Sequence, residues 1–168
     1  TVFLNIGKRS PASLFGGFDT ATVIDTEGYV TVITKTVSDS PTSEIKCHFL
    51  PNREKAVKAA CCKDSAIALS QSGRVFEYSL KAPNKSFVEV SELSRIKITE
   101  ITGSCLHFFA VSADGRVFGR GSNICYKLVM PPEVMELSTF IVIDSLSKCK
   151  VVEAFVVSAR PVVFQDIN

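Results

Sequence analysis

The 168-residue sequence predicts an all-β fold built from repeated units of four short strands. Two observations carry this prediction. Many segments of strand length alternate apolar and polar residues, and glycines that favour tight turns recur at a nearly regular spacing. Helical periodicity is hard to find. The best helical candidate, residues 51–58, is short and charged and opens with proline, so we expect a loop or a single turn there.

Two segments that end in the same residues, Gly–Arg–Val–Phe, show the repeat most clearly: residues 58–76 and 100–118. A third copy at 14–30 matches them in pattern, and a fourth begins at residue 154. The turn positions of the four copies are 45, 42 and 53 residues apart, at Gly28, Gly73, Gly115 and Asn168. Gly or Asn is expected at such positions because a tight hairpin turn needs a residue that tolerates positive φ.

The spacing divides the chain into units at about 10–53, 54–96, 97–148 and a truncated 149–168. We expect the strands of the second unit at 56–62, 66–70, 74–80 and 86–90. Those of the third are expected at 98–103, 108–112, 116–119 and 137–144, with a long loop over 122–135. Such units form blades, so we predict β-propeller blades in a single repeat domain that belongs to a longer propeller.

Composition and charge exclude several classes of function. Apolar residues make up 46% of the chain and the mean hydropathy is +0.24, which indicates a folded protein. Every apolar run is too short to span a bilayer, so we expect no membrane segment. The net charge of +2 and the scattered basic residues do not favour nucleic-acid binding. Six cysteines in a chain of this size are expected to be reduced thiols, which predicts an intracellular protein, cytoplasmic or nuclear.

The third unit carries a more specific pattern. It consists of Gly103, His107, Asp114 with Gly115, Phe118, and then Gly119, Gly121 and Asn123. This pattern resembles the repeat of the regulator of chromosome condensation family, and the four copies register over nearly the whole chain. The resemblance implies a seven-bladed propeller around a central channel, of which this chain would supply about half. It further implies that His107 is a structural, inward-facing polar group bonded to neighbouring backbone.

The chain departs from the family pattern at several positions. The family continues after the asparagine with Gly–Gln–Leu–Gly, whereas this chain has Tyr126–Lys–Leu–Val129, so we expect that turn to be built differently or lost. The other copies replace the family's histidine with Thr20, Ser65 and Arg160. The sequence therefore indicates a divergent member whose fold persists.

No metal or cofactor site is expected. His48 is interpreted as a surface or loop-adjacent residue, and Cys61 and Cys62 are expected to point to opposite faces of a strand without forming a zinc site. The glycines at 103, 119 and 121 do not open a helix, so they are not a phosphate cradle. We assign structural turn or packing roles to these positions: Gly28, Gly73, Gly103, His107, Asp114, Gly115, Gly119, Gly121 and Asn123.

The sequence favours a binding protein over an enzyme, because nothing places a nucleophile, a base and an orienting acid together. The leading hypothesis is a scaffold that binds a protein partner, a small GTPase or a larger assembly, through loops on one face. Arg74 and Arg116, which follow the turn glycines, either face that partner or are solvated turn charges. The alternative implied by the resemblance is guanine-nucleotide exchange on a Ran-like GTPase, although no wedge residue can be matched.

A partial ring also has consequences for assembly. Half a propeller would leave open blade edges and an unpacked blade face at each end. The chain begins with Thr1, and we expect it to be a fragment or a processed piece. We therefore expect more chain, a second copy or a partner to cover the open edges.

Overall fold

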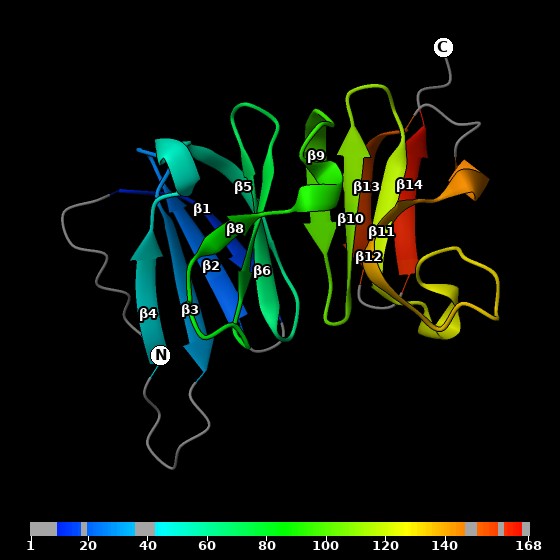
Figure 1. Ribbon diagram of the computed structural model, residues 1–168, viewed down its shortest axis with the longest axis horizontal. Coiled ribbons are helices and arrows are strands. Elements are labelled where there is room, and N and C mark those ends of the chain that lie inside the picture. Colours follow the sequence, from blue (N-terminus) through cyan, green and yellow to red (C-terminus); the bar gives the residue numbers. More distant parts are fainter. Residues whose placement is uncertain (1–9, 18–19, 36–42, 147–150, 158–159, 166–168) are drawn as a thin grey trace.

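A computed structural model describes residues 10–17, 20–35, 43–146, 151–157 and 160–165. These residues form three four-stranded antiparallel sheets and one two-stranded sheet, arranged in chain order (Figure 1). The described part contains no α-helix, only turns of 3-10 helix, so the prediction of an all-β fold is confirmed. These turns are η1 (Pro51–Arg53), η2 (Ser91–Leu93), η3 (Ile124–Tyr126) and η4 (Asp144–Leu146).

Each four-stranded sheet consists of four consecutive strands. The first has β1 (Pro11–Gly16), β2 (Thr20–Asp25), β3 (Val30–Lys35) and β4 (Ser43–His48). The second has β5 (Ala56–Cys61), β6 (Ser65–Ser70), β7 (Val75–Ser79) and β8 (Phe87–Glu89). The third has β9 (Ile98–Gly103), β10 (His107–Ser112), β11 (Val117–Ser122) and β12 (Glu136–Val142). The fourth unit contributes the antiparallel pair β13 (Val151–Val157) and β14 (Arg160–Gln165).

The strand positions agree with the sequence prediction to within a few residues. The largest difference is β11, which we expected to end at residue 119 and which continues to Ser122. It continues because Gly121 stays in register with His107 of β10 on one side and Leu137 of β12 on the other. The turn position predicted at Asn168 lies outside the described residues.

The sheets stand face to face, as the blades of a propeller do. The first strand of each sheet packs against the first strand of the next, so β1, β5, β9 and β13 form the inner row (Figure 1). Within each sheet, every later strand lies further from this inner row. This arrangement is the sector of a propeller that the repeat predicts.

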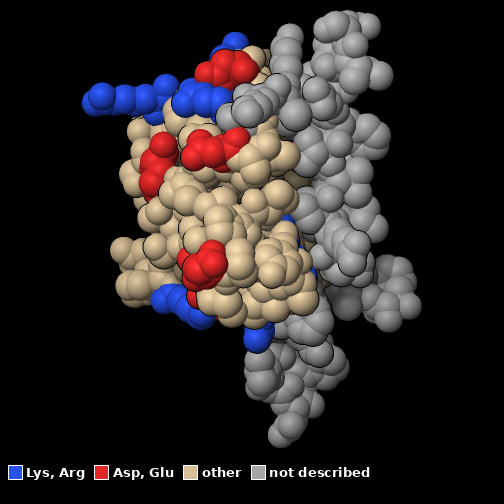
Figure 2. Space-filling view, turned by 90° about the vertical axis from the view of Figure 1, so that its right-hand side faces the viewer, with Lys and Arg blue, Asp and Glu red and all other residues tan. Residues whose placement is uncertain are grey.

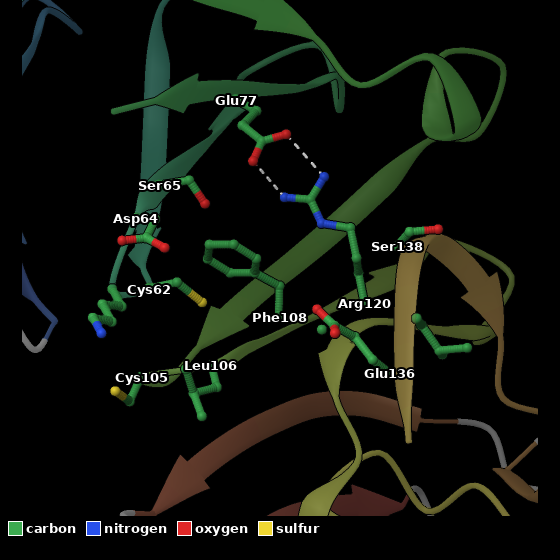
Figure 3. A pocket seen from close by; sticks show the side chains of 13 residues that line it. Cys62, Asp64, Ser65, Glu77, Cys105, Leu106, Phe108, Arg120, Glu136 and Ser138 are labelled. Atoms are coloured by element: carbon green, nitrogen blue, oxygen red, sulfur yellow. Dashed lines mark hydrogen bonds and ion pairs between the residues drawn. The ribbon is translucent and has the colours of Figure 1, made fainter. Parts of the chain in front are cut away.

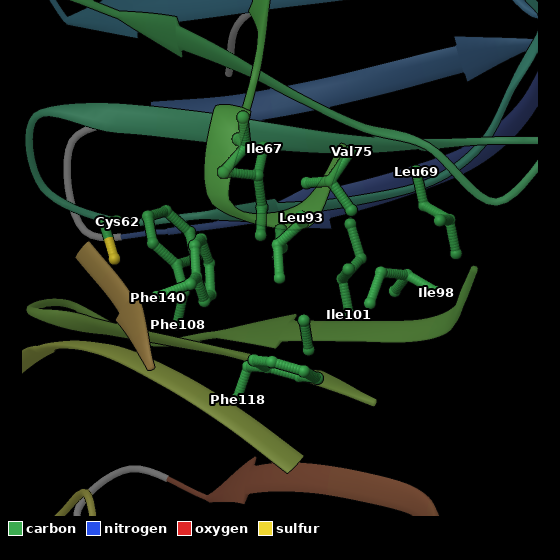
Figure 4. Close-up of a cluster of buried hydrophobic side chains, with 13 residues drawn as sticks. Cys62, Ile67, Leu69, Val75, Leu93, Ile98, Ile101, Phe108, Phe118 and Phe140 are labelled. Atoms are coloured by element: carbon green, nitrogen blue, oxygen red, sulfur yellow. The ribbon is translucent and has the colours of Figure 1, made fainter. Parts of the chain in front are cut away.

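Three apolar clusters fill the spaces along this stack of sheets. Successive residues of one strand belong to different clusters because side chains alternate between the faces of a sheet. Ile67 and Leu69 enter the cluster between the second and third sheets (Figure 4), whereas Ala68 enters the cluster between the first and second. Phe108 and Phe109 divide in the same way across the third sheet. The central sheets are therefore buried on both faces.

The turn glycines hold neighbouring blades together. Gly28 and Gly73 have φ of 86° and 90°, and their carbonyls accept hydrogen bonds from Ala56 (3.1 Å) and Ile98 (2.9 Å), the first residues of the next sheets. A Cβ on Gly28 would lie 2.7 Å from the Cβ of Lys55. A side chain at this turn would thus meet the incoming chain of the following blade as well as a strained backbone.

Candidate functional site

One end of the blades gathers the β5–β6 and β9–β10 hairpins and the loop of residues 123–135. A pocket of about 360 Å³ lies here between the second and third sheets (Figure 3). The hairpins contribute Cys62, Asp64 and Leu106 to its lining, and β11 and β12 contribute Arg120 and Glu136. The pocket therefore opens beside the loop that the sequence marks as the longest in the third unit.

Arg120 crosses between the blades inside this pocket. Its Nη1 and Nη2 donate to the two carboxylate oxygens of Glu77 at 2.8 and 2.6 Å (Figure 3). The guanidinium also lies 5.4 Å from the ring centroid of Phe108 and 4.8 Å from that of Phe140. Because a bidentate pair between two rings holds the arginine in one geometry, Arg120 fastens the third sheet to the second.

The paired cysteines face different blades, as the alternation of strand side chains requires. The thiol of Cys61 lies 3.5 Å from the hydroxyl of Thr22 in the first sheet, and that of Cys62 donates to the carbonyl of His107 in the third at 3.3 Å. Burial raises the pKa of Cys62 to about 12, so its thiol is protonated at neutral pH. Among the residues described, no group of three or more His, Cys, Asp or Glu could hold a metal ion.

His107 is buried at the start of β10. Its Nδ1 lies 2.9 Å from the hydroxyl of Ser104, and its ring meets that of Phe109 edge to face. The family resemblance implied a bond to neighbouring backbone, whereas this ring is bonded to a side-chain hydroxyl in the same hairpin. Burial, together with the positive charge of Lys127, lowers the pKa of His107 to about 4. The imidazole is therefore neutral near pH 7.

Asn123 organises the long loop from a buried position. Its Nδ2 donates to the carbonyls of Met130, Pro131 and Val134, the last at 2.7 Å, and its Oδ1 accepts the backbone N–H of Leu128 at 3.0 Å. One side chain thus provides hydrogen-bond partners for four backbone groups of a loop that has no strand pairing of its own.

Of the two alternatives expected for the turn after Asn123, loss is ruled out, because the turn is present and is built from residues other than glycine. Tyr126 and Val129 have φ of 58° and 56°, and these are the two positions where the family pattern has glycine. Leu128 between them is buried in the third apolar cluster. The left-handed turn is therefore present, and it is made by residues that adopt this conformation only with strain.

The loop and the adjoining hairpin expose a group of apolar side chains, which we call the loop patch: Leu106, Ile124, Tyr126, Val129 and Met135. Two backbone hydrogen bonds tie the hairpin and the loop to the end of β11: Ser122 N–H donates to the Leu106 carbonyl and Asn123 N–H to the Met135 carbonyl. Figure 2 views the molecule from the side on which this loop projects in Figure 1. The described surface on this face is largely uncharged, with acidic and basic side chains in both its upper and its lower half.

Two predicted positions, Arg74 and Arg116, lie at the opposite end of the blades. Arg74 pairs with Glu54 and with Glu89, whereas Arg116 pairs with Asp114 in its own turn. Each guanidinium also covers the ring of the phenylalanine two residues later, at 5.3 and 5.5 Å. The two arginines are matched in position and differ in their partners.

The glycines predicted to have packing roles lie on two strands of the third sheet: Gly103 on β9, and Gly119 and Gly121 on β11. A Cβ would lie 2.7 Å from the Phe108 ring at Gly103, 2.8 Å from Ile143 at Gly119, and 2.2 Å from the Leu106 carbonyl at Gly121. Gly121 also has φ of 109°. Gly115 has φ of 85° in the β10–β11 turn.

His48 is the last residue of β4 and is half-buried, so it is loop-adjacent as expected. Its ring also contacts the second sheet, with centroids 5.0 Å from Tyr78 and 5.9 Å from Phe87. The alternation of β4 could not show this, because the partner rings come from the next sheet. Glu77 and Arg120 were also missed, since their pairing joins segments more than forty residues apart.

The architecture described above defines a β-propeller segment, and comparison with known proteins specifies its type. No protein-family model matches the chain, and no curated protein matches it in sequence. Among solved structures it is similar to human WBSCR16, with a TM-score of 0.75 and 17% identity over 94% of this chain and 45% of that one. It is also similar to yeast RCC1 (Prp20) bound to Kap60, with a TM-score of 0.73 and 12% identity over 92% of this chain and 42% of that one.

A further structure, Prp20p from Saccharomyces cerevisiae, gives a TM-score of 0.71 at 11% identity and covers 88% of this chain and 42% of that one. The chain therefore has an RCC1-like β-propeller fold, and it spans less than half the length of these solved chains. The predicted fold class is confirmed. No helix in the described ranges is both long and apolar enough to cross a membrane.

Proposed function

We propose that this propeller segment is a non-catalytic scaffold that binds a protein partner through the loop patch. The observation that carries the proposal is the gathering of exposed apolar side chains on the loop and the adjoining hairpin. Five of the ten large apolar side chains exposed in the described part of the chain belong to the patch, and Tyr126 is 60% exposed. Exposed apolar side chains that gather in one region of an otherwise buried β-structure are typical of an interface for another protein.

The way the loop is held supports the same proposal. Asn123 anchors the loop from below, so the patch is presented in one conformation and little ordering is needed on binding. The left-handed Tyr126 and Val129 store backbone strain there, and such strain concentrates at binding and catalytic sites. The blades act as the rigid frame.

Two of the similar structures are compatible with a protein-binding role. One reports Prp20 bound to Kap60, and another the binding of Prp20p to Gsp1p and histones. For this chain, an intracellular location, cytoplasmic or nuclear, and completion of the ring by more chain, a second copy or a partner belong to the same proposal.

The proposal is tested by isolating the chain with its bound proteins from cells and quantifying them by mass spectrometry. The variant Ile124→Ser with Tyr126→Ser removes apolar side chains from the patch. Val88→Ser is the matched control, because Val88 is 63% exposed on the outer strand of the second sheet. We expect at least one protein to be lost with the loop variant and kept with the control. Equal recovery with all three chains would contradict the proposal.

Nucleotide exchange is tested separately, by release of labelled GDP from a Ran-like GTPase. A scaffold leaves the release rate unchanged. Rapid release at catalytic concentrations of this chain would favour the exchange alternative over the scaffold.

A further inference from the structure

The end of the blades opposite the loop patch carries a repeated set of cations. In the second unit the set is Arg53, Lys55 and Arg74, and in the third it is Arg95, Lys97 and Arg116. The two sets are equivalent in the structure. Lys55 and Lys97 directly precede the first strands of their sheets, and their carbonyls accept hydrogen bonds from the next turn, from Gln71 N–H at 2.9 Å and Ala113 N–H at 2.8 Å.

In the second unit, acidic side chains neutralise the arginine of the set. Arg74 Nη1 donates to Glu54 Oε1 at 2.6 Å, and Nε donates to Glu89 Oε1 at 2.8 Å. The hydrogen bonds from Arg74 lower the pKa of Glu89, so this carboxylate stays charged and engaged over a wide pH range. Arg74 is an internal connection of its own blade.

In the third unit the two corresponding acids are replaced by apolar residues. Ile96 stands where the second unit has Glu54, between the arginine and the lysine. Val142 stands where it has Glu89, because Phe76 pairs with Glu89 and Phe118 pairs with Val142 in the two sheets. The replacement removes both carboxylates that hold the equivalent arginine.

Arg116 is consequently available for an outside partner. Its side chain is 46% exposed, and its Nε donates to Asp114 Oδ2 at 2.9 Å. Within the described chain its two Nη groups make no hydrogen bond, and the Phe118 ring lies beneath the guanidinium. The guanidinium is thus oriented by its turn and presents the pair of donors that bind a carboxylate or phosphate in bidentate fashion.

These residues also line an open surface pocket of about 240 Å³. Arg95, Lys97 and Arg116 line it together with Ile96 and Asp114. The volume is below that of a site for a whole drug-sized ligand, so it suits one charged group carried by something larger. We call this site the linker-end pocket.

We propose that the linker-end pocket binds an anionic group, a carboxylate or a phosphate, carried by an acidic segment of a protein partner. Three cationic residues and one carboxylate, Asp114, line it. Glu54 and Glu89 interrupt the basic residues at the equivalent end of the second blade, so the positive surface is local. A short acidic segment matches that pattern, whereas a nucleic-acid backbone requires an extended basic track.

The linker-end pocket and the loop patch are independent sites. They lie at the two ends of β11, whose six residues extend over roughly 17–20 Å. A partner could reach both, and each is tested by its own variants. Failure of the loop-patch proposal therefore leaves the linker-end proposal standing, and the reverse also holds.

The test uses fluorescence anisotropy of a labelled octaglutamate peptide with the 168-residue chain at low salt, where ionic contacts are weakly screened. Arg116→Gln is the test variant, and Arg74→Gln is its matched control at the equivalent position of the second blade. We expect Arg116→Gln to weaken binding about fivefold or more, and Arg74→Gln by less than about twofold, because Arg74 is already paired. Circular dichroism verifies that both variants are folded.

Three results would overturn the proposal. One is that octaglutamate does not bind more tightly than a labelled octaglutamine. Another is that the two variants weaken binding equally, which would indicate a diffuse charge effect. The last is that single-stranded polynucleotide binds more tightly than octaglutamate and loses more affinity in Arg116→Gln, which would assign the pocket to nucleic acid. The proposal is supported if a labelled phosphopeptide, used in place of octaglutamate, also binds and is weakened by Arg116→Gln to the same extent.

Discussion

Replacing Val129 by glycine should relieve backbone strain in the loop after Asn123. Val129 has φ of 56°, a conformation that costs an L-residue roughly 1–2 kcal/mol and is least tolerated by β-branched side chains. Glycine adopts it without that cost. Val129→Gly nevertheless has opposing effects, because glycine loses about 0.5–1 kcal/mol more conformational entropy on folding and the part of the valine that is buried is removed.

Val88→Gly separates these contributions. Val88 lies on β8 and is 63% exposed, against 39% for Val129, so both substitutions introduce the same glycine entropy and remove a partly exposed valine. Only Val129→Gly relieves a left-handed backbone. We expect Val88→Gly to lower the free energy of unfolding by about 1 kcal/mol, and Val129→Gly to leave it within about 0.5 kcal/mol of wild type or to raise it.

The contrast is measured by urea unfolding and by thermal melts followed with circular dichroism. A difference of 1 kcal/mol corresponds to about 2–4 °C in Tm for a chain of this size. If Val129→Gly destabilised the chain as much as Val88→Gly, the turn would hold no strain and the argument from the left-handed conformation would fail. If Val129→Gly stabilised the chain and weakened partner binding, the strained conformation of the loop would contribute to binding at a cost in stability.

Three further outcomes follow from the packing and charges. Gly121→Ala should lower the free energy of unfolding by about 3 kcal/mol or more, since its Cβ would lie 2.2 Å from a backbone carbonyl. Gly16→Ala should be nearly neutral, because its Cβ would have nothing within 4 Å. Similar thermal melts for both variants would contradict this. Glu77→Gln should lower the free energy of unfolding in urea by about 2 kcal/mol, because it leaves the partly buried guanidinium of Arg120 without its charge partner. Asp64→Asn removes one member of an exposed pair and should lower it by under about 0.5 kcal/mol. Equal losses in the two variants would contradict this. His107 has a pKa of about 4 in the folded chain and 6.5 in the reference state, so the unfolded chain takes up the proton first as the pH falls. The free energy of unfolding should therefore decrease by roughly 3 kcal/mol between pH 6.5 and pH 4. His107→Gln should reduce this dependence on pH, and an unchanged dependence would exclude this histidine as its cause.

The sequence alone predicted the features that depend on near neighbours in the chain. Alternation assigned Cys61 and Cys62 to opposite faces, and the recurring glycines marked the turns, because both signals arise within a few residues. The repeat and the family resemblance then led from strands to propeller blades. Asn123 was recognised as part of a motif, but the backbone groups it satisfies were visible only in the folded loop.

The tertiary structure decided everything that depends on which blade faces which. Arg120 finds Glu77 across an interface, and Gly28 is pressed against Lys55 of the next blade, although no local pattern pairs these residues. Arg74 and Arg116 both directly follow the turn glycine of their units, yet their charges differ in availability. The physical reason is that an arginine's partners come from separate strands and linkers, and only the packed sheets bring those segments within hydrogen-bonding distance.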